Sequence, residues 1–252
     1  MAQFPPKTSG KNKTYAGIGS EVTPLEICEL EIKLAKVLAS EGWILRSGHA
    51  RGSDRAFEEG AASIGDPKLL QIFVPFWRGV EKQPWHQLGP ALPAWNEANR
   101  IAALHHPGWT SLPETHKILH ARNSFQVLGP ELNDPVDMVV CWTEDGAMSG
   151  GTSQALRIAK EREIPIFNLG TSEGLAAVKS FLNPVKMDYQ AGDVVRLRSA
   201  PNLTYIVTGT YAITGDGHAD ETYVLLESIP GKMKACWKPQ ALELVPQEEY
   251  AP

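Results

Sequence analysis

The chain has few cysteines, no long apolar run and no basic excess, and each shortage argues against a class of protein. Its three cysteines, Cys28, Cys141 and Cys236, form neither a CxxC pair nor a metal-ligand spacing, so we expect reduced, mostly buried thiols. No stretch approaches the roughly 20 apolar residues of a membrane span, and the polar start MAQFPPKTSGKNK lacks an apolar signal segment. We therefore expect a cytoplasmic protein without a membrane partner.

Neither half of the chain is basic. The net charge is -5, and residues 186–252 carry 6 Lys and Arg against 9 Asp and Glu, leaving 18 against 20 for residues 1–185. A protein that neutralises nucleic-acid phosphates usually shows a basic excess or stripe. We therefore expect no stable DNA complex, and the charge balance favours a small anionic ligand.

Several catalytic and metal-binding signatures are also missing. The sequence contains no GxSxG elbow, no lysine-containing phosphate loop of the Walker type and no Cys-His pair. His116 and His120 are four residues apart on an expected helix, but no HExxH motif or third ligand accompanies them. We expect no metal site and no cofactor, and we interpret both histidines as structural or surface residues.

What the sequence does contain is an alternation of short apolar runs with amphipathic helices, which predicts an α/β fold. After a flexible N-terminus (1–13), we expect a Rossmann-like parallel sheet with helices on both faces (14–183). Thr23 is the expected N-cap of the first helix, with Glu26 completing a capping box. The expected strands are 14–18, 43–45, 69–74, 137–142 and 164–169.

Residues 75–114 interrupt this alternation with several prolines and four of the seven tryptophans: Trp77, Trp85, Trp95 and Trp109. We interpret the segment as an insertion, because long irregular segments inside a compact domain are usually lids or binding loops. The aromatic rings are suited to core packing, to stacking on a ligand base or to contact with a partner subunit.

The pattern changes to period 2 after Asn183 and Pro184. Five short strands within about 60 residues predict a small all-β SH3-like barrel over residues 186–246. Its 6 basic against 9 acidic residues favour protein contacts over nucleic acid. The expected strands are 193–197, 205–211, 222–226, 234–237 and 242–245, separated by turns at 201–202, 214–217 and 230–231.

Three glycine-rich turns each follow an expected strand and precede an expected helix: Gly17–Ser20, Ser47–Asp54 and Gly150–Thr152. Such a turn lets backbone N–H groups approach an anion while the helix N-terminus adds partial positive charge. A single turn of this kind is a weak signal, since glycine also serves purely steric needs. The carboxyl ends of adjacent parallel strands meet at one crevice, so we expect the three turns to converge there.

The segments YAGIGS (residues 15–20), SGHARGSD (47–54), HARN (120–123) and SGGTSQALRIA (149–159) resemble a superfamily often called SLOG. It unites the DNA-processing protein Smf/DprA with the cytokinin-activating LOG proteins, and the resemblance covers roughly residues 14–182. A family of phage-encoded proteins is more similar still. The resemblance implies a nucleotide-binding domain of Rossmann type.

The resemblance also implies ligand-binding roles. Arg122 would make bidentate phosphate contacts, with a surface salt bridge within its helix as the alternative. Asp54 would contact ribose hydroxyls or cap the second helix. The residues implied in binding are Gly17, Gly19, Ser20, Gly48, Arg51, Gly52, Ser53, Asp54, Arg122, Asn123, Thr143, Gly150, Gly151 and Thr152.

Ala155 stands where LOG enzymes carry their catalytic glutamate, counting from Gly151 and Thr152. We therefore expect a protein that senses or sequesters an ADP-ribose-type or cyclic nucleotide signal, in host cytoplasm and against host defence if phage-encoded. One alternative is a hydrolase of nucleotide N-glycosidic bonds that uses Glu144 or Asp145. The other is a DprA-like single-stranded DNA binder. We expect a homo-oligomer, a dimer or larger.

Overall fold

The computed structural model describes residues 3–6, 12–148, 150–182, 193–197, 200–215, 218–228, 234–237 and 242–244. By its internal contacts the chain divides into two compact units, Met1–Leu182 and Asn183–Pro252. The boundary expected at Asn183 and Pro184 lies outside the described residues. No helix in the described part is long and apolar enough to cross a membrane.

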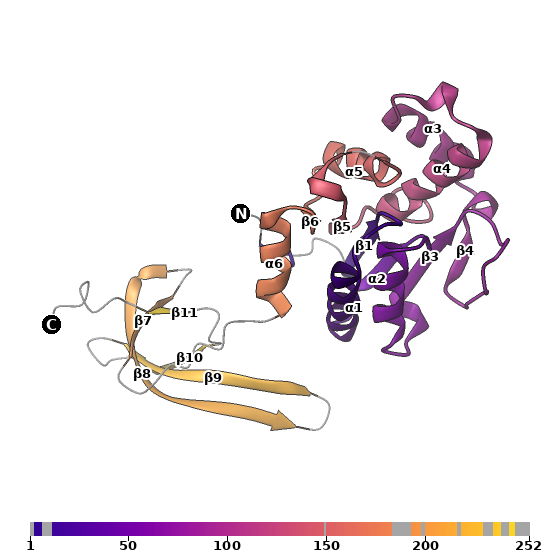
Figure 1. Ribbon diagram of the computed structural model, residues 1–252. Helices are drawn as coiled ribbons and strands as arrows, with labels where there is room; N and C mark the ends of the chain where they lie inside the picture. The colour runs from indigo at the N-terminus through magenta and orange to yellow at the C-terminus, as the bar shows by residue number, and fades with distance from the viewer. Residues whose placement is uncertain are drawn as a thin grey trace. The chain divides into compact units, whose positions relative to one another are not determined.

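The first unit is built on a six-stranded sheet in which all neighbouring strands are parallel (Figure 1). The strand order is β4-β3-β2-β1-β5-β6, so the chain reverses its direction across the sheet between β1 and β5. This confirms the expected α/β class and parallel sheet. The strands are β1 (Thr14–Gly19), β2 (Ile44–Ser47), β3 (Leu70–Val74), β4 (His86–Leu88), β5 (Met138–Trp142) and β6 (Ile166–Asn168).

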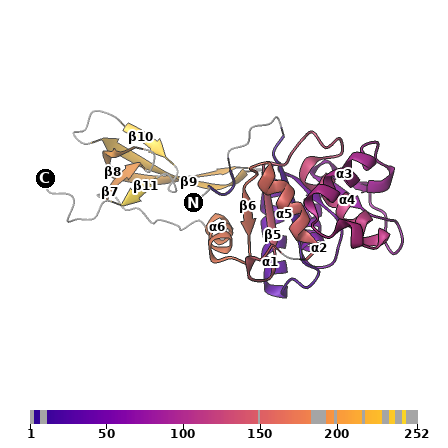
Figure 2. The same ribbon diagram turned by 90° about the horizontal axis from the view of Figure 1, so that it is seen from above.

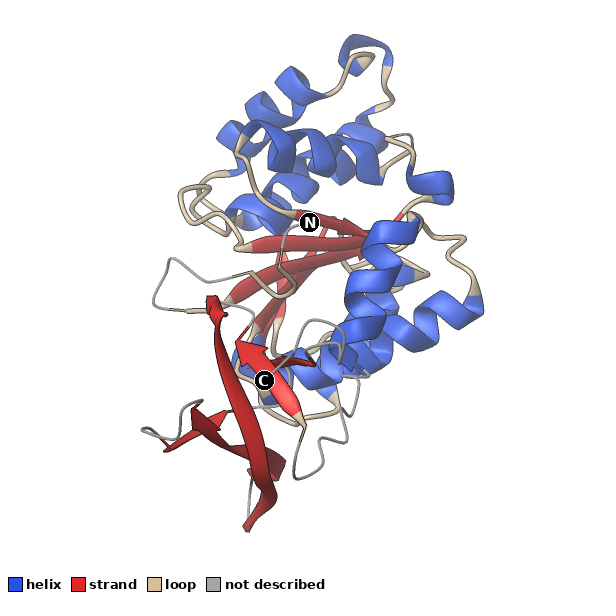
Figure 3. Cartoon of the chain, turned by 90° about the vertical axis from the view of Figure 1, so that its left-hand side faces the viewer, coloured by secondary structure: helices blue, strands red, loops and turns tan. Residues whose placement is uncertain are grey.

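Helices cover both faces of this sheet (Figure 3). On one face Leu34, Phe57 and Val178 belong to a single buried cluster with the sheet. On the other face Val127 and Ile158 belong to a second cluster. The first face carries α1 (Leu25–Ser40), α2 (Ser53–Ala62) and α6 (Ser172–Leu182), and the second carries α3 (Trp95–His105), α4 (Glu114–Leu128) and α5 (Thr152–Glu161).

Part of the expected flexible N-terminus packs on this unit. The ring of Phe4 meets Phe167 and Phe181 edge-on, with centroids 4.7 and 5.2 Å apart. Aromatic pairs favour this geometry, which adds to the area that the rings bury. Residues 1, 2 and 7–11 of that segment lie outside the described residues.

The expected capping box at the start of α1 is wrong. The helix begins at Leu25, Pro24 occupies the N-cap position, and no side chain caps the helix. Thr23 instead donates its hydroxyl hydrogen bond to the carbonyl oxygen of Ser20 at 2.7 Å, and its Oγ1 lies 2.9 Å from Oγ of Ser53. One partner in the preceding loop and one on α2 therefore take the place of the helix cap.

The segment 75–114, expected as an irregular insertion, contains regular secondary structure. It contributes the sixth strand β4, the helix α3 and two short turns of 3-10 helix, η2 (Gly89–Ala91) and η3 (Trp109–Ser111). The ring of Trp95 stacks on Phe125 with centroids 6.2 Å apart and an angle of 19° between planes. Trp77 and Trp85 pack against the cluster on the first face. Core packing therefore accounts for these three rings.

The second unit contains an antiparallel sheet of order β10-β9-β8-β7-β11 (Figure 2). Residues 201–202, expected as a turn, lie inside β8, whereas the turn at 230–231 lies outside the described residues. No described pairing joins β10 to β11, so the SH3-like barrel stays a prediction. The strands are β7 (Val194–Leu197), β8 (Ala200–Gly215), β9 (His218–Ser228), β10 (Lys234–Trp237) and β11 (Leu242–Leu244).

Candidate ligand-binding site

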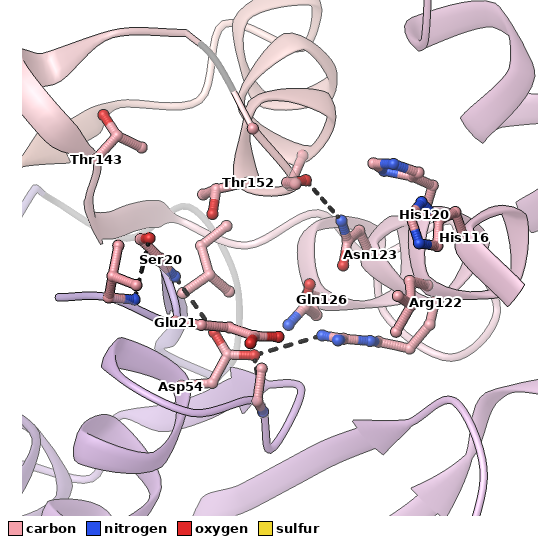
Figure 4. Close-up of a pocket in the computed structure, with 18 of the residues that line it drawn as sticks. Ser20, Glu21, Asp54, His116, His120, Arg122, Asn123, Gln126, Thr143 and Thr152 are labelled. Atoms are coloured by element: carbon pink, nitrogen blue, oxygen red, sulfur yellow. Dashed lines mark hydrogen bonds and ion pairs between the residues drawn. The ribbon is translucent and has the colours of Figure 1, made fainter. Parts of the chain in front are cut away.

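A cavity of about 560 Å³ lies at the carboxyl ends of β1 and β5, where the strand order reverses (Figure 4). Ligands of open α/β sheets bind at this place, and small-molecule pockets have this size. The lining residues come from the end of β1, from the loops after β1, β2 and β5, and from α2, α4 and α5. They are Ile18, Gly19, Ser20, Glu21, Val22, Ala50, Asp54, His116, Leu119, His120, Arg122, Asn123, Gln126, Thr143, Glu144, Gly150, Gly151, Thr152 and Ala155.

Arg122 is the buried cation of this cavity. Only 5% of the residue is exposed, and Nη1 lies 3.4 Å from Oδ2 of Asp54 on α2. Its Nε has no hydrogen-bond partner, and neither does Nε2 of Gln126, one helical turn away (Figure 4). The alternative of a surface salt bridge within α4 is therefore wrong. Burial lowers the pKa of Arg122, while the charge of Asp54 acts to raise it.

Of the three glycine-rich loops, the first (17–20), second (47–54) and third (150–152), the second is shaped to receive this guanidinium. A Cβ atom at Gly48 would lie 1.5 Å from Nη1 of Arg122 and 2.6 Å from Nε2 of Gln126. Any side chain at position 48 would therefore displace the guanidinium. Gly48 contributes to the site by leaving room for the Arg122 side chain and does not itself line the cavity.

Asp54 holds the first two loops together. Its Oδ1 accepts a hydrogen bond from the N–H of Gly19 at 3.2 Å, and its Oδ2 accepts one from Ala50 at 3.4 Å. The residue at the N-cap of α2 is Gly52, so Asp54 is not its cap. Burial raises the pKa of Asp54, and the charge of Arg122 acts against this rise. One N–H group expected to bind an anion is thus already used within the protein.

Glycines of the first two loops allow the loops to pack closely. A Cβ at Gly19 would lie 2.2 Å from Oγ of Ser53, and one at Gly17 would lie 2.5 Å from the ring of Phe57. Gly52 has φ 71° and ψ -130°, and a Cβ there would lie 2.2 Å from the carbonyl oxygen of Ser20. The steric need for glycine therefore explains these positions.

The third loop is different, because a Cβ added at Gly150 or Gly151 would meet no atom within 4 Å. Helix α5 begins at Thr152 without a side-chain cap. The first N–H groups of a helix lack intrahelical acceptors and attract anions. Asn123 donates from Nδ2 to the carbonyl oxygen of Gly151 at 3.2 Å and so joins α4 to this loop. The third loop is the part of the site with free space for an anionic group.

Thr143 is held in the wall by Asn168. The N–H of Thr143 donates to Oδ1 of Asn168 at 3.2 Å, and its Oγ1 accepts a hydrogen bond from Nδ2 at 2.7 Å. The residues implied by the resemblance divide into two groups. Those in the lining are Gly19, Ser20, Asp54, Arg122, Asn123, Thr143, Gly150, Gly151 and Thr152, and those outside it are Gly17, Gly48, Arg51, Gly52 and Ser53.

His116, His120 and Gln126 line the cavity, and none of them was expected to bind the ligand. Burial, with a smaller effect of the neighbouring His106, lowers the pKa of His120 to about 4, so its imidazole is neutral at neutral pH. Its Nδ1 is buried without a partner. Helical spacing was the available signal: on α4, His116, His120 and Gln126 lie seven, three and three residues from Asn123.

One group in the described part of the chain could hold a metal ion: His49, Glu58 and His86. Nδ1 of His49 lies 2.6 Å from Glu58 Oε2, and Nε2 of His86 lies 2.7 Å from Oε1. Trp85 donates from Nε1 to the same carboxylate at 3.0 Å, and the N–H of Gln83 donates to Nδ1 of His86 at 3.4 Å. These contacts form a hydrogen-bonded cluster in which His86 carries its proton on Nε2, and a metal would have to displace that proton.

No protein-family model and no curated protein matches the chain. It is similar in fold to DNA processing protein A of Helicobacter pylori, a single-stranded DNA-binding protein, with 21% identity and a TM-score of 0.42 over 71% of this chain and 82% of that one. It is also similar to the Moco carrier protein of Chlamydomonas rheinhardtii, with 16% identity and a TM-score of 0.41 over 69% and 86%. Both likenesses concern the fold alone.

Proposed function

We propose that the first unit binds a nucleotide or nucleotide-derived ligand, of ADP-ribose or cyclic nucleotide type, and senses or sequesters it. The observation that supports this most is Arg122, a buried guanidinium with an unpartnered Nε in the wall of a cavity of about 560 Å³. A buried donor without a partner costs about 1–3 kcal/mol. A ligand acceptor would remove that cost, and α5 begins in the same cavity.

The other charges of the lining narrow the ligand class. Glu21, Asp54 and Glu144 line the cavity as well, so its wall is not uniformly positive. Inorganic phosphate or a polyanion would meet these carboxylates unfavourably. A nucleotide carries hydroxyl and amino donors beside its phosphate, and these donors suit carboxylates while the phosphate suits Arg122 and the start of α5.

Binding without cleavage is the simpler function. Ala155 lines the cavity at the position where LOG enzymes carry their glutamate, and a methyl group has no proton to exchange. In a phage-encoded protein, sequestration would remove a host defence signal. The second candidate, hydrolysis of an N-glycosidic bond, is favoured by one observation: Glu144 lines the same cavity.

Calorimetry against mononucleotides, ADP-ribose species and cyclic nucleotides tests the proposal. We expect one class to bind, and Arg122→Ala to weaken its binding by about 1.5–3 kcal/mol, or about 10- to 150-fold, through loss of a charge-assisted contact. Arg100→Ala is the control, because Arg100 pairs with Glu97 on the surface. Circular dichroism establishes that both variants fold. No binding across the panel, or equal losses in both variants, would contradict the proposal.

The bound ligand also separates the two candidate functions. We expect prolonged incubation followed by chromatography to return the ligand intact, because the cavity lacks the glutamate of LOG enzymes. Release of free base over several turnovers would favour the hydrolase, and Glu144→Gln would then abolish the release. Without that release, Glu144 has no catalytic role.

A further inference from the structure

Glu31 is a buried carboxyl group without a cation. It is 0% exposed, its Oε2 has no hydrogen-bond partner, and among the described residues no lysine or arginine pairs with it. The titratable groups that face it are Asp54 from α2, Cys28 from α1 and Cys141 from β5. An ionised Glu31 would be a second buried anion beside Asp54, and the cation Arg122 is already paired with Asp54.

A chain of short contacts leads from Glu31 to the first loop of the candidate site. Oε1 of Glu31 lies 2.8 Å from Oγ of Ser53, which lies 2.9 Å from Oγ1 of Thr23. The hydroxyl of Thr23 donates to the carbonyl oxygen of Ser20 at 2.7 Å. The chain thus holds three contacts between oxygens, but only two hydroxyl protons.

The number of available protons decides which oxygen donates in each of these three contacts. A carbonyl oxygen accepts only, so the single proton of Thr23 goes to Ser20. Oγ1 of Thr23 must then accept from Ser53, whose own single proton is used in that bond. The remaining contact needs a proton on Oε1 of Glu31, and all three contacts are hydrogen bonds when the acid donates it.

The electrostatics agree with this count. Burial raises the pKa of Glu31 to about 8, with the hydrogen bond to Ser53 acting against the rise and the charge of Asp54 adding to it. A buried carboxyl group that lacks donors avoids the cost of an uncompensated charge by keeping its proton. The geometry and the pKa therefore lead to the same neutral acid at neutral pH.

We propose that Glu31 is a positioning residue, a neutral acid whose proton fixes the first loop of the site through Ser53 and Thr23. Ser20 and its neighbours Gly19 and Glu21 line the cavity. Loss of the proton makes Glu31 an acceptor, so Ser53 turns to it and its bond to Thr23 is lost. The link to ligand binding rests on the proposed function, whereas the protonation of Glu31 and its hold on the loop do not.

The direction of the pH effect follows from linkage. A carboxyl group with a raised folded-state pKa stabilises the fold fully below its unfolded value of 4.5, and this contribution is lost as the pH rises towards about 8. The same ionisation adds negative charge beside the Arg122–Asp54 pair and releases the first loop. Affinity for an anionic ligand should therefore fall as the pH rises through about 8.

Glu31→Gln in the full chain tests the proposal, because its amide donates to Ser53 as the neutral acid does but does not titrate. Urea unfolding is followed between pH 5 and pH 9. We expect the urea midpoint of the wild type to fall as the pH rises. The midpoint of Glu31→Gln should fall less over the same pH range. Glu29→Gln, at an exposed position of the same helix, should keep the wild-type profile. An unchanged pH profile in Glu31→Gln would overturn the protonated state.

A second readout follows the loop without any ligand. The N–H of Ser20 donates to the carbonyl oxygen of Trp142 at 3.2 Å, so its hydrogen exchange reports on this loop. After correction for intrinsic exchange, we expect its protection to fall above pH 8 in the wild type and to persist in Glu31→Gln. Equal protection in both proteins at pH 9 would show that Glu31 does not position the loop. Failure of the nucleotide panel would leave both readouts unaffected.

Discussion

Glu31 on α1 and Glu58 on α2 are both buried, at 0% and 6% exposed, but the groups that surround them differ. Glu58 meets N–H groups of Trp85, His86 and His49 on its two oxygens. Burial acts to raise the pKa of Glu58, but these hydrogen bonds outweigh it and hold the pKa below its usual value. Glu31 meets one hydroxyl, and its pKa is raised. The number of donors therefore decides the charge of each group.

The kind of donor decides what each region can do. The indole N–H of Trp85 donates only, so it fixes Glu58 as an anion and holds β4 and its preceding loop against α2. The hydroxyls of Ser53 and Thr23 both donate and accept, so the chain from Glu31 can reverse when one proton leaves. Glu58 is therefore an anchor that holds β4 and its preceding loop on α2. The hydrogen bonds that begin at Glu31 change with pH beside the cavity.

The largest loss of stability is expected when Glu58 is removed. Glu58→Ala removes the shared acceptor and leaves an unpaired donor on the buried His86 and on the half-buried Trp85 and His49, so we expect it to cost about 3 kcal/mol at neutral pH. Urea unfolding measures the loss. Glu59→Ala, at the next and exposed position of α2, serves as the control. A loss below about 1 kcal/mol would show that Glu58 is not an anchor.

A smaller effect is expected in the hydroxyl chain. Ser53→Ala removes one hydroxyl between Glu31 and Thr23, which we expect to cost about 1 kcal/mol in unfolding free energy. It should also raise the pKa of Glu31 further, because the ionised carboxylate loses the hydroxyl of Ser53 as a hydrogen-bond donor. Thermal and urea unfolding at two pH values measure both. Ser40→Ala, on the exposed end of α1, is the control. Equal losses of unfolding free energy in the two variants would show that the hydroxyl of Ser53 contributes no more than an exposed hydroxyl.

Local sequence patterns predicted most of the sheet but not its edge. The strands β1, β2, β3, β5 and β6 each contain an apolar run that the pattern located, whereas β4 is the three residues His86–Leu88, too short to show a period. Thr23 followed the local rule for a helix cap and was still misassigned, because its hydroxyl bonds to the carbonyl oxygen of Ser20 and to the hydroxyl of Ser53 instead of to the helix. The pattern for a helix cap does not include partners outside the helix, whether in the preceding loop, as Ser20, or 30 residues away, as Ser53.

The candidate site was also predicted in part from the sequence. The three glycine turns were expected to converge, and residues of all three border the cavity. Each was expected to bring backbone N–H groups to an anion. The glycines of the first two loops instead pack against Phe57, Ser53, Ser20 and Arg122, and only the third loop has open space. Glycine by itself does not reveal whether a ligand or a neighbouring side chain fills the place of its missing Cβ.

The sequence by itself determined the alternation of strands and helices and the position of the glycine turns after the strands. Hydrophobic period and turn composition are properties of neighbouring residues, so they can be read along the chain. The tertiary structure alone decided which groups carry charge. Glu31 meets Ser53 from 22 residues away, and Arg122 meets Asp54 from 68 residues away. A pKa depends on burial and on the donors and charges within a few ångströms, which only the folded chain brings together.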